Sequence, residues 1–174
     1  ASADWLGAAA VFAWSFYSQG TSDASSASSD IFLSEALTFF GDAATANSPK
    51  HADDKARRLV HLLRERRALL VLDGLEPLQH PPSFPLRGQL KDRAVATLLK
   101  GLAAQNPGLC VLTTRYAVKD LDGAGTSAKC HPIKRLSNDA GAALLIMLGV
   151  HGRAGELKDA VEEGIIDRNP CRVK

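Results

Sequence analysis

The sequence has few cysteines, and its charges of opposite sign are nearly balanced. The 174 residues include only three cysteines, Cys110, Cys130 and Cys171, which are widely spaced and form no CxxC pair. That pattern argues against a disulfide framework or a zinc site. The 21 basic and 19 acidic residues leave a formal net charge of +2, too small to indicate a nucleic acid or an anionic membrane as the main partner. We therefore expect a cytoplasmic protein with no nucleic-acid partner.

The sequence also lacks a long apolar run near its N-terminus. The longest, residues 5–17, has no lysine or arginine before it and is shorter than the ~20 residues that a membrane-spanning helix needs. We expect neither a signal peptide nor a membrane anchor. The chain begins at Ala1 and its one methionine is Met147, so we expect a piece of a longer protein.

Several enzyme motifs are missing. There is no GxxxxGK[ST], and no glycine directly precedes a lysine anywhere; GxSxG, HExxH and GxGxxG are missing too. The five histidines show no metal-ligand spacing. A serine hydrolase has only scattered serine and histidine residues in its favour.

Apolar periodicity predicts alternating strands and helices. Residues 68–73 and 109–114 are continuously apolar and end in polar residues, which is typical of parallel strands covered by helices on both faces. Residues 10–16 and 132–136 are weaker strand candidates. Helical patterns cover about residues 30–40, 53–67 and 89–104; a fourth begins at a Ser137 cap and contains residues 142–148, and a short fifth covers 156–163. The alternation predicts an α/β fold, a three-layer, mainly parallel sheet flanked by helices, with one core over residues 1–163 and a separate tail at 164–174.

The second helical pattern, residues 53–67, is rich in arginine. Its spacing predicts i,i+4 ion pairs Asp53–Arg57 and Asp54–Arg58 on a solvated face. Its five arginines fit a solvated face better than a binding patch. The buried stripe is expected to consist of Ala56, Leu59, Val60 and Leu63.

Two carboxylates follow the strand at residues 68–73. Asp73 stands at the strand tip and Glu76 three residues later. In a nucleotide hydrolase the first carboxylate holds the water shell of Mg²⁺, and the second orients or deprotonates the attacking water. The same pattern also fits a buried strand followed by a turn in which both carboxylates face solvent.

A second group of polar residues ends the strand at residues 109–114. Thr113, Thr114 and Arg115 supply two hydroxyls and a guanidinium, which is suited to a γ-phosphate because its planar fork stays charged and makes two parallel hydrogen bonds. Together the two strand ends predict a metal side, Asp73 and Glu76, and a phosphate side formed by the second group.

These residues resemble the nucleotide-binding domain of STAND-class P-loop NTPases, the group that includes NACHT and NB-ARC signalling ATPases. The sequence LLVLDGLE at 69–76 looks like the Walker B motif, and LTTR at 112–115 like the sensor strand. FAWSFYSQ at 12–19 and LS at 136–137 with AGAALL at 140–145 are similar to a strand with its loop and to a later helical part. The match covers roughly residues 5–163.

The resemblance implies roles for individual residues. Asp73 would serve Mg²⁺ through water, Glu76 the attacking water and Arg115 the γ-phosphate of ATP, with Thr113 and Thr114 beside the nucleotide. The family's phosphate-binding loop precedes the first strand found here, so the isolated chain is expected to bind nucleotide weakly and to be inactive alone.

The family's sheet order, 5-1-4-3-2, also predicts the arrangement of the strands. The strand near Val11 would be second, 69–73 third, 109–114 fourth and 132–136 a poorly formed fifth. Without the first strand, the order 4-3-2 leaves an open edge on the fourth strand and favours self-association. The alternative is a noncatalytic α/β interaction module that binds a protein through the arginine-rich helix or the proline-rich loop at 81–85.

Overall fold

The computed structural model describes residues 5, 7–17, 29–123, 127–133 and 136–162. The chain divides into two units, Ala1–Cys130 and His131–Lys174, called here the first and the second unit. The single core expected over residues 1–163 spans both units and stays a prediction. The expected tail at 164–174 lies outside the described residues.

Three parallel strands form the sheet of the first unit. They are β1 (Ala10–Ser15), β2 (Ala68–Asp73) and β3 (Leu109–Leu112), in the order β1-β2-β3. This is the order 4-3-2 expected from the sequence. The strand β3 is shorter than predicted, since Thr113 and Thr114 follow it rather than extend it. The amide of Thr113 still donates to the carbonyl of Leu72, at 3.0 Å, so the first residue after β3 stays attached to β2.

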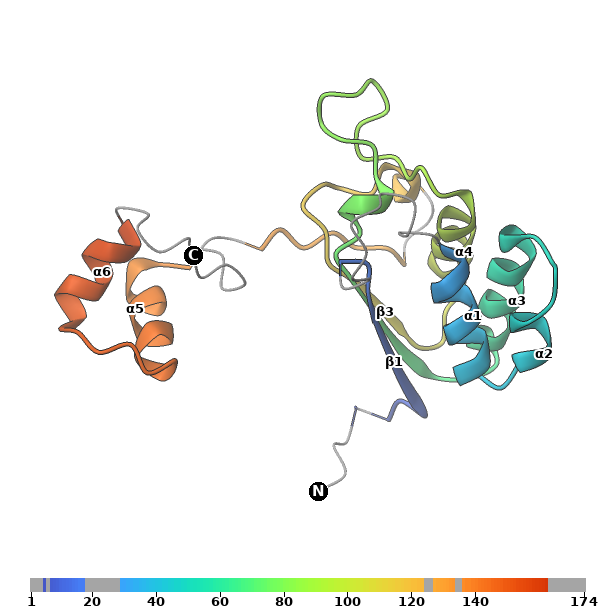
Figure 1. Ribbon diagram of the computed structural model, residues 1–174, viewed down its shortest axis with the longest axis horizontal. Helices are drawn as coiled ribbons and strands as arrows, with labels where there is room; N and C mark the ends of the chain where they lie inside the picture. The colour runs from blue at the N-terminus through green and yellow to red at the C-terminus, as the bar shows by residue number, and fades with distance from the viewer. Residues whose placement is uncertain (1–4, 6, 18–28, 124–126, 134–135, 163–174) are drawn as a thin grey trace. The chain divides into compact units, whose positions relative to one another are not determined.

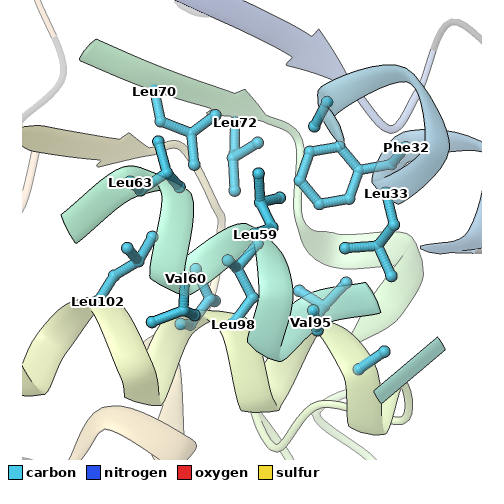
Figure 2. Packing of buried hydrophobic residues seen from close by; sticks show 14 of the residues in the cluster. Phe32, Leu33, Leu59, Val60, Leu63, Leu70, Leu72, Val95, Leu98 and Leu102 are labelled. Carbon is cyan, nitrogen blue, oxygen red and sulfur yellow. The ribbon is translucent and has the colours of Figure 1, made fainter. Parts of the chain in front are cut away.

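Three helices cover one face of this sheet: α1 (Ser29–Phe39), α3 (Ala52–Arg64) and α4 (Arg93–Ala104) (Figure 1). Alternate residues of β2 point towards them, and Leu70 and Leu72 are fully buried against α3. Figure 2 shows the side chains of α3 between the sheet and α4. Burial of this kind contributes roughly 1.5–3 kcal/mol for each large apolar side chain. All four residues of the predicted stripe on α3 are buried, namely Ala56, Leu59, Val60 and Leu63.

The opposite face of the sheet is less covered than its apolar residues predicted. Leu109 is 59% exposed and Val111 is 39% exposed, whereas their neighbours Cys110 and Leu112 pack against the core. Within the described residues of the first unit, α1, α3 and α4 all lie on the same side of the sheet. The expected second layer on the other face is not formed by these residues.

The helices depart from the sequence prediction in three places. The helix α3 ends at Arg64 rather than at residue 67. The structure adds a short helix, α2 (Ala43–Ala46), where the Asp42 carboxylate accepts from the Thr45 amide at 3.0 Å. The helix α4 begins at Arg93 rather than at residue 89, because the carboxylate of Asp92 caps it by accepting from the Val95 amide at 3.0 Å.

The predicted i,i+4 ion pairs of α3 are wrong. Asp53 pairs with Arg93 at 2.9 Å, and Arg58 pairs with Asp42 at 2.5 Å. The local pair is Arg57 with Asp54, three residues apart. The start of α4 and the cap of α2 place these partners beside α3.

The second unit contains α5 (Asn138–Met147) and α6 (Ala154–Glu162). The hydroxyl of Ser137 caps α5, as predicted, by accepting from the Ala140 amide at 3.2 Å. A small core joins the two helices, consisting of Ala142, Leu145 and Leu157. Of the expected fifth strand, residues 132, 133 and 136 lie in no strand, and residues 134–135 are outside the described part. No helix among the described residues has the length and apolarity to cross a membrane.

Candidate functional site

The ends of all three strands meet at the carboxyl edge of the sheet, with Asp73 in the middle. Ser15 is the register partner of Asp73, and Thr113 follows β3 on the other side. The Thr113 hydroxyl donates to Oδ1 of Asp73 at 2.6 Å, and the Ser15 hydroxyl donates to Oδ2 at 3.2 Å. The carboxylate is therefore held in one orientation by hydroxyls from both neighbouring strands.

Gly74 makes the turn that follows Asp73. Its φ of +70° lies in the left-handed region, and its amide donates to the Thr113 hydroxyl at 2.9 Å. The ring of Tyr17 lies so close that a Cβ at this position would be 2.1 Å from its Cδ2. Glycine is thus required both by the backbone conformation and by the approach of Tyr17.

Glu76 begins a short 3₁₀ helix, η1 (Glu76–Leu78), that follows this turn. Its side chain is only 14% exposed, and its Oε1 lies 3.9 Å from Nε of Arg115, whose own side chain is half exposed. Its Oε2 is buried and accepts no hydrogen bond from the described residues. The carboxylate therefore faces the guanidinium, and Oε2 accepts from none of the donors that the structure describes.

Tyr17 stands beside these charged groups. Partial burial, followed by the interaction with the Glu76 carboxylate, raises the pKa of its hydroxyl above the usual value. The charge of Asp73 acts in the same direction and that of Arg115 opposes it. The hydroxyl stays protonated at neutral pH and can donate a hydrogen bond.

The two predicted threonines have bonds within the protein. Thr113 holds Asp73, as described above, while the Thr114 hydroxyl donates to Oε1 of Gln79 at 2.6 Å. Both had been expected beside a nucleotide. In this structure they orient other residues of the site, and Arg115 is the cation with an exposed face.

All five predicted residues thus gather at one edge of the sheet. Three participants were missed: Ser15, Tyr17 and Gln79. The position of Ser15 at the end of a predicted strand was a usable signal, since parallel strands align their carboxyl ends. Neither Tyr17 nor Gln79 carries a comparable local signal.

The oxygen donors fit a magnesium ion held through water. Mg²⁺ prefers hard oxygen ligands and keeps several waters, so one or two carboxylates suffice to bind it. Asp73 supplies such a carboxylate, flanked by hydroxyls. Within the described ranges there is no group of three or more His, Cys, Asp or Glu residues able to enclose a metal. A carboxylate of this kind could accept hydrogen bonds from the waters of a hydrated Mg²⁺.

Comparison of the chain with protein-family models, with curated proteins and with solved structures gives no match.

Proposed function

We propose that this chain is part of the nucleotide-binding domain of a STAND-class signalling ATPase, in which ATP binding and hydrolysis switch the conformation of the whole protein. The carrying observation is that Asp73, Glu76 and Arg115 converge at the carboxyl edge of two adjacent parallel strands. Open parallel sheets bind their ligands at this edge. The likeness of LLVLDGLE and LTTR to the family's motifs supports the same proposal.

The metal side of the site consists of Asp73 and the hydroxyls that hold it. A bound Mg²⁺ would neutralise the charge of the phosphates. The carboxylate of Asp73 would accept hydrogen bonds from the waters around the ion. Ser15 and Thr113 fix the direction of its oxygens, which limits the reorganisation needed on binding.

Glu76 and Arg115 would act on the reacting groups. Glu76 would accept a hydrogen bond, and then a proton, from an attacking water; no residue that the structure describes donates to its Oε2. Arg115 would bind the γ-phosphate through its exposed guanidinium. Nε of Arg115 lies 3.9 Å from Oε1 of Glu76. A bound phosphate would compete with the Glu76 carboxylate for the guanidinium of Arg115. Phosphate binding would therefore weaken the ion pair and leave the carboxylate able to move.

The proposal also predicts weak binding by this chain itself. It contains no GxxxxGK[ST], so it lacks the backbone amides and the lysine that hold phosphates in P-loop proteins. We expect MgATP binding no tighter than about 1 mM, which corresponds to roughly 4 kcal/mol. In the proposed parent protein an upstream segment would supply the loop and the strand that pairs with the open edge of β3. Nucleotide, these segments and a second copy of the chain are the expected partners.

Calorimetry on two proteins tests the proposal: the 174-residue chain, and the same chain extended by any segment that its coding DNA encodes in frame upstream. The extended protein should bind and hydrolyse ATP. Asp73→Ala and Glu76→Gln should abolish hydrolysis, and Glu76→Gln should keep ATP binding. Arg115→Ala should reduce the preference for ATP over ADP, while Arg57→Ala, at an exposed arginine of α3, should not.

Two results would contradict the proposal. Micromolar binding of MgATP by the 174-residue chain would show that the missing loop is not the main source of affinity. Hydrolysis by Glu76→Gln at the parent rate would show that this carboxylate does not act on the attacking water.

The second candidate is a noncatalytic interaction module, and the observation that favours it is the exposed proline-rich loop. Residues 81–87 are all exposed, Phe84 and Leu86 among them, and this segment belongs to the projecting green loop in Figure 1. A coding sequence with a start codon near Ala1 and no upstream GxxxxGK[ST] would favour this candidate.

The arginine-rich helix gives the interaction module less support than the loop. Arg58 is bound to Asp42, and Nη2 of Arg64 donates to the Gly101 carbonyl at 2.9 Å. Arg66 lies over the ring of Phe40, 5.9 Å from its centre. These side chains are engaged within the first unit, so they do not form a free basic patch.

A further inference from the structure

Gln79 is a buried amide with no role in the function proposed above. It follows η1, and only 2% of its surface is exposed. Its Nε2 donates to the carbonyls of Gly88 at 3.1 Å and Tyr116 at 3.2 Å, and its Oε1 accepts from the Thr114 hydroxyl at 2.6 Å. Both donor hydrogens and the acceptor oxygen are thus in use, as a buried amide requires.

The partners of this amide lie on both sides of Arg115. Thr114 immediately precedes Arg115, and Tyr116 immediately follows it. The ladder between β2 and β3 has already ended, with the bond from the Thr113 amide to Leu72. Gln79 therefore holds the chain around Arg115 where the sheet no longer does.

The same short segment also carries Glu76. Glu76 is the first residue of η1, and Gln79 directly follows its last residue. The backbone N–H of Gln79 donates to the backbone carbonyl of Glu76 at 3.0 Å, which closes this turn. One hydrogen-bonded turn therefore bears both the carboxylate that faces Arg115 and the side chain that holds the chain on either side of Arg115.

We propose that Gln79 is a positioning residue that fixes Arg115 opposite Glu76. A glutamate at this position would lack the two donors and place a charge in a buried site, and an asparagine is one methylene shorter. The effect on a bound phosphate rests on the function proposed above, whereas the placement of Arg115 does not.

Nuclear magnetic resonance of the 174-residue chain tests the placement. Backbone order parameters at Arg115 and Tyr116 should fall from about 0.85 to below about 0.6 in Gln79→Met, which keeps the size of the side chain and removes its hydrogen bonds. Thr114→Val removes the bond to Oε1 of Gln79, together with the bonds of the same hydroxyl to the amide and the carbonyl of Tyr116, and should give an intermediate loss. If Gln79→Met unfolds the chain, an unchanged order at Arg115 in Thr114→Val still overturns the inference.

Asp120→Ala is the matched control. Asp120 accepts from the Leu90 amide at 2.7 Å and pairs with Lys100 at 3.3 Å. It therefore holds the end of the proline-rich loop, as Gln79 does at Gly88, but has no hydrogen bond or ion pair with the described residues 114–116. Its removal should leave the order of Arg115 unchanged. The inference is overturned if Asp120→Ala lowers that order as much as Gln79→Met, or if Gln79→Met and Thr114→Val both leave it intact.

A second measurement separates the placement from the proposed function. The Nε–Hε signal of Arg115, assigned by its loss in Arg115→Lys, is followed during titration with MgATP and with MgADP. It should shift further with MgATP, and Gln79→Met should lose this difference. Equal shifts in the wild-type chain would overturn the γ-phosphate role and leave the placement standing. A full difference in Gln79→Met would overturn the positioning role.

Discussion

Replacing Thr113 with valine should destabilise the first unit by about 1–2 kcal/mol. Valine keeps the shape of the side chain but removes the hydroxyl that donates to Asp73 at 2.6 Å and accepts from the Gly74 amide at 2.9 Å. A hydrogen bond to a charged group contributes about 1.5–3 kcal/mol and one between neutral groups about 0.5–1.5 kcal/mol. Because residue 113 is exposed, water can replace part of both bonds, so we expect less than their sum.

Urea unfolding followed by tryptophan fluorescence measures this change. Both tryptophans, Trp5 and Trp14, belong to the first unit, so the signal reports on the unit that contains the site. Thr113→Ser, which keeps the hydroxyl, should retain most of the stability. Thr38→Val is the control, because its exposed hydroxyl bond to the Ser34 carbonyl should contribute no more than about 0.5 kcal/mol. Equal losses in Thr113→Val and Thr38→Val would refute the argument.

Three further outcomes follow from the structure. The Arg58 guanidinium lowers the pKa of Asp42 from 3.8 to about 2, so the ionised carboxylate stabilises the fold above pH 3.8 and this contribution is lost as the pH falls towards 2. The urea midpoint of Asp42→Asn should therefore depend less on pH in this range than that of the wild type. Plots of midpoint against pH that run parallel for the two proteins would contradict the pairing. Burial raises the pKa of the Cys110 thiol to about 12, so at pH 8 a maleimide should label exposed Cys130 first and Cys110 only in urea, as mass spectrometry of the peptides will show. Leu72→Ala, at a fully buried position, should lower the free energy of unfolding by about 2–5 kcal/mol, and a loss below about 1 kcal/mol in the urea assay would contradict its place in the core.

The local pattern of apolar residues was sufficient to predict the strands and helices that bury a row of apolar side chains. The apolar residues of 68–73 predicted β2, and the spacing of Leu59 and Leu63 predicted the buried side of α3. The cap of α5 at Ser137 was equally visible, because an N-cap bond joins residues three apart. Such signals depend on neighbours within one or two turns, which the sequence displays directly.

The sequence also indicated where the polar residues of the site would gather, because it contained two strands with polar ends. It did not indicate what each hydroxyl would bind. Thr113 and Thr114 were expected beside a phosphate, yet they bond to Asp73 and Gln79, which lie 40 and 35 residues away along the chain.

Only the tertiary structure decided which charges pair and which face of the sheet is covered. Asp53 pairs with Arg93 on another helix instead of with Arg57 on its own, and Leu109 remains exposed although its strand is apolar throughout. Apolar residues on both faces of a strand show that either face can be buried, but not which helices reach it. The pairing of charges and the burial of a face depend on the packing of segments distant in sequence, since contact energies fall off over a few ångströms in space and not over a fixed number of residues along the chain.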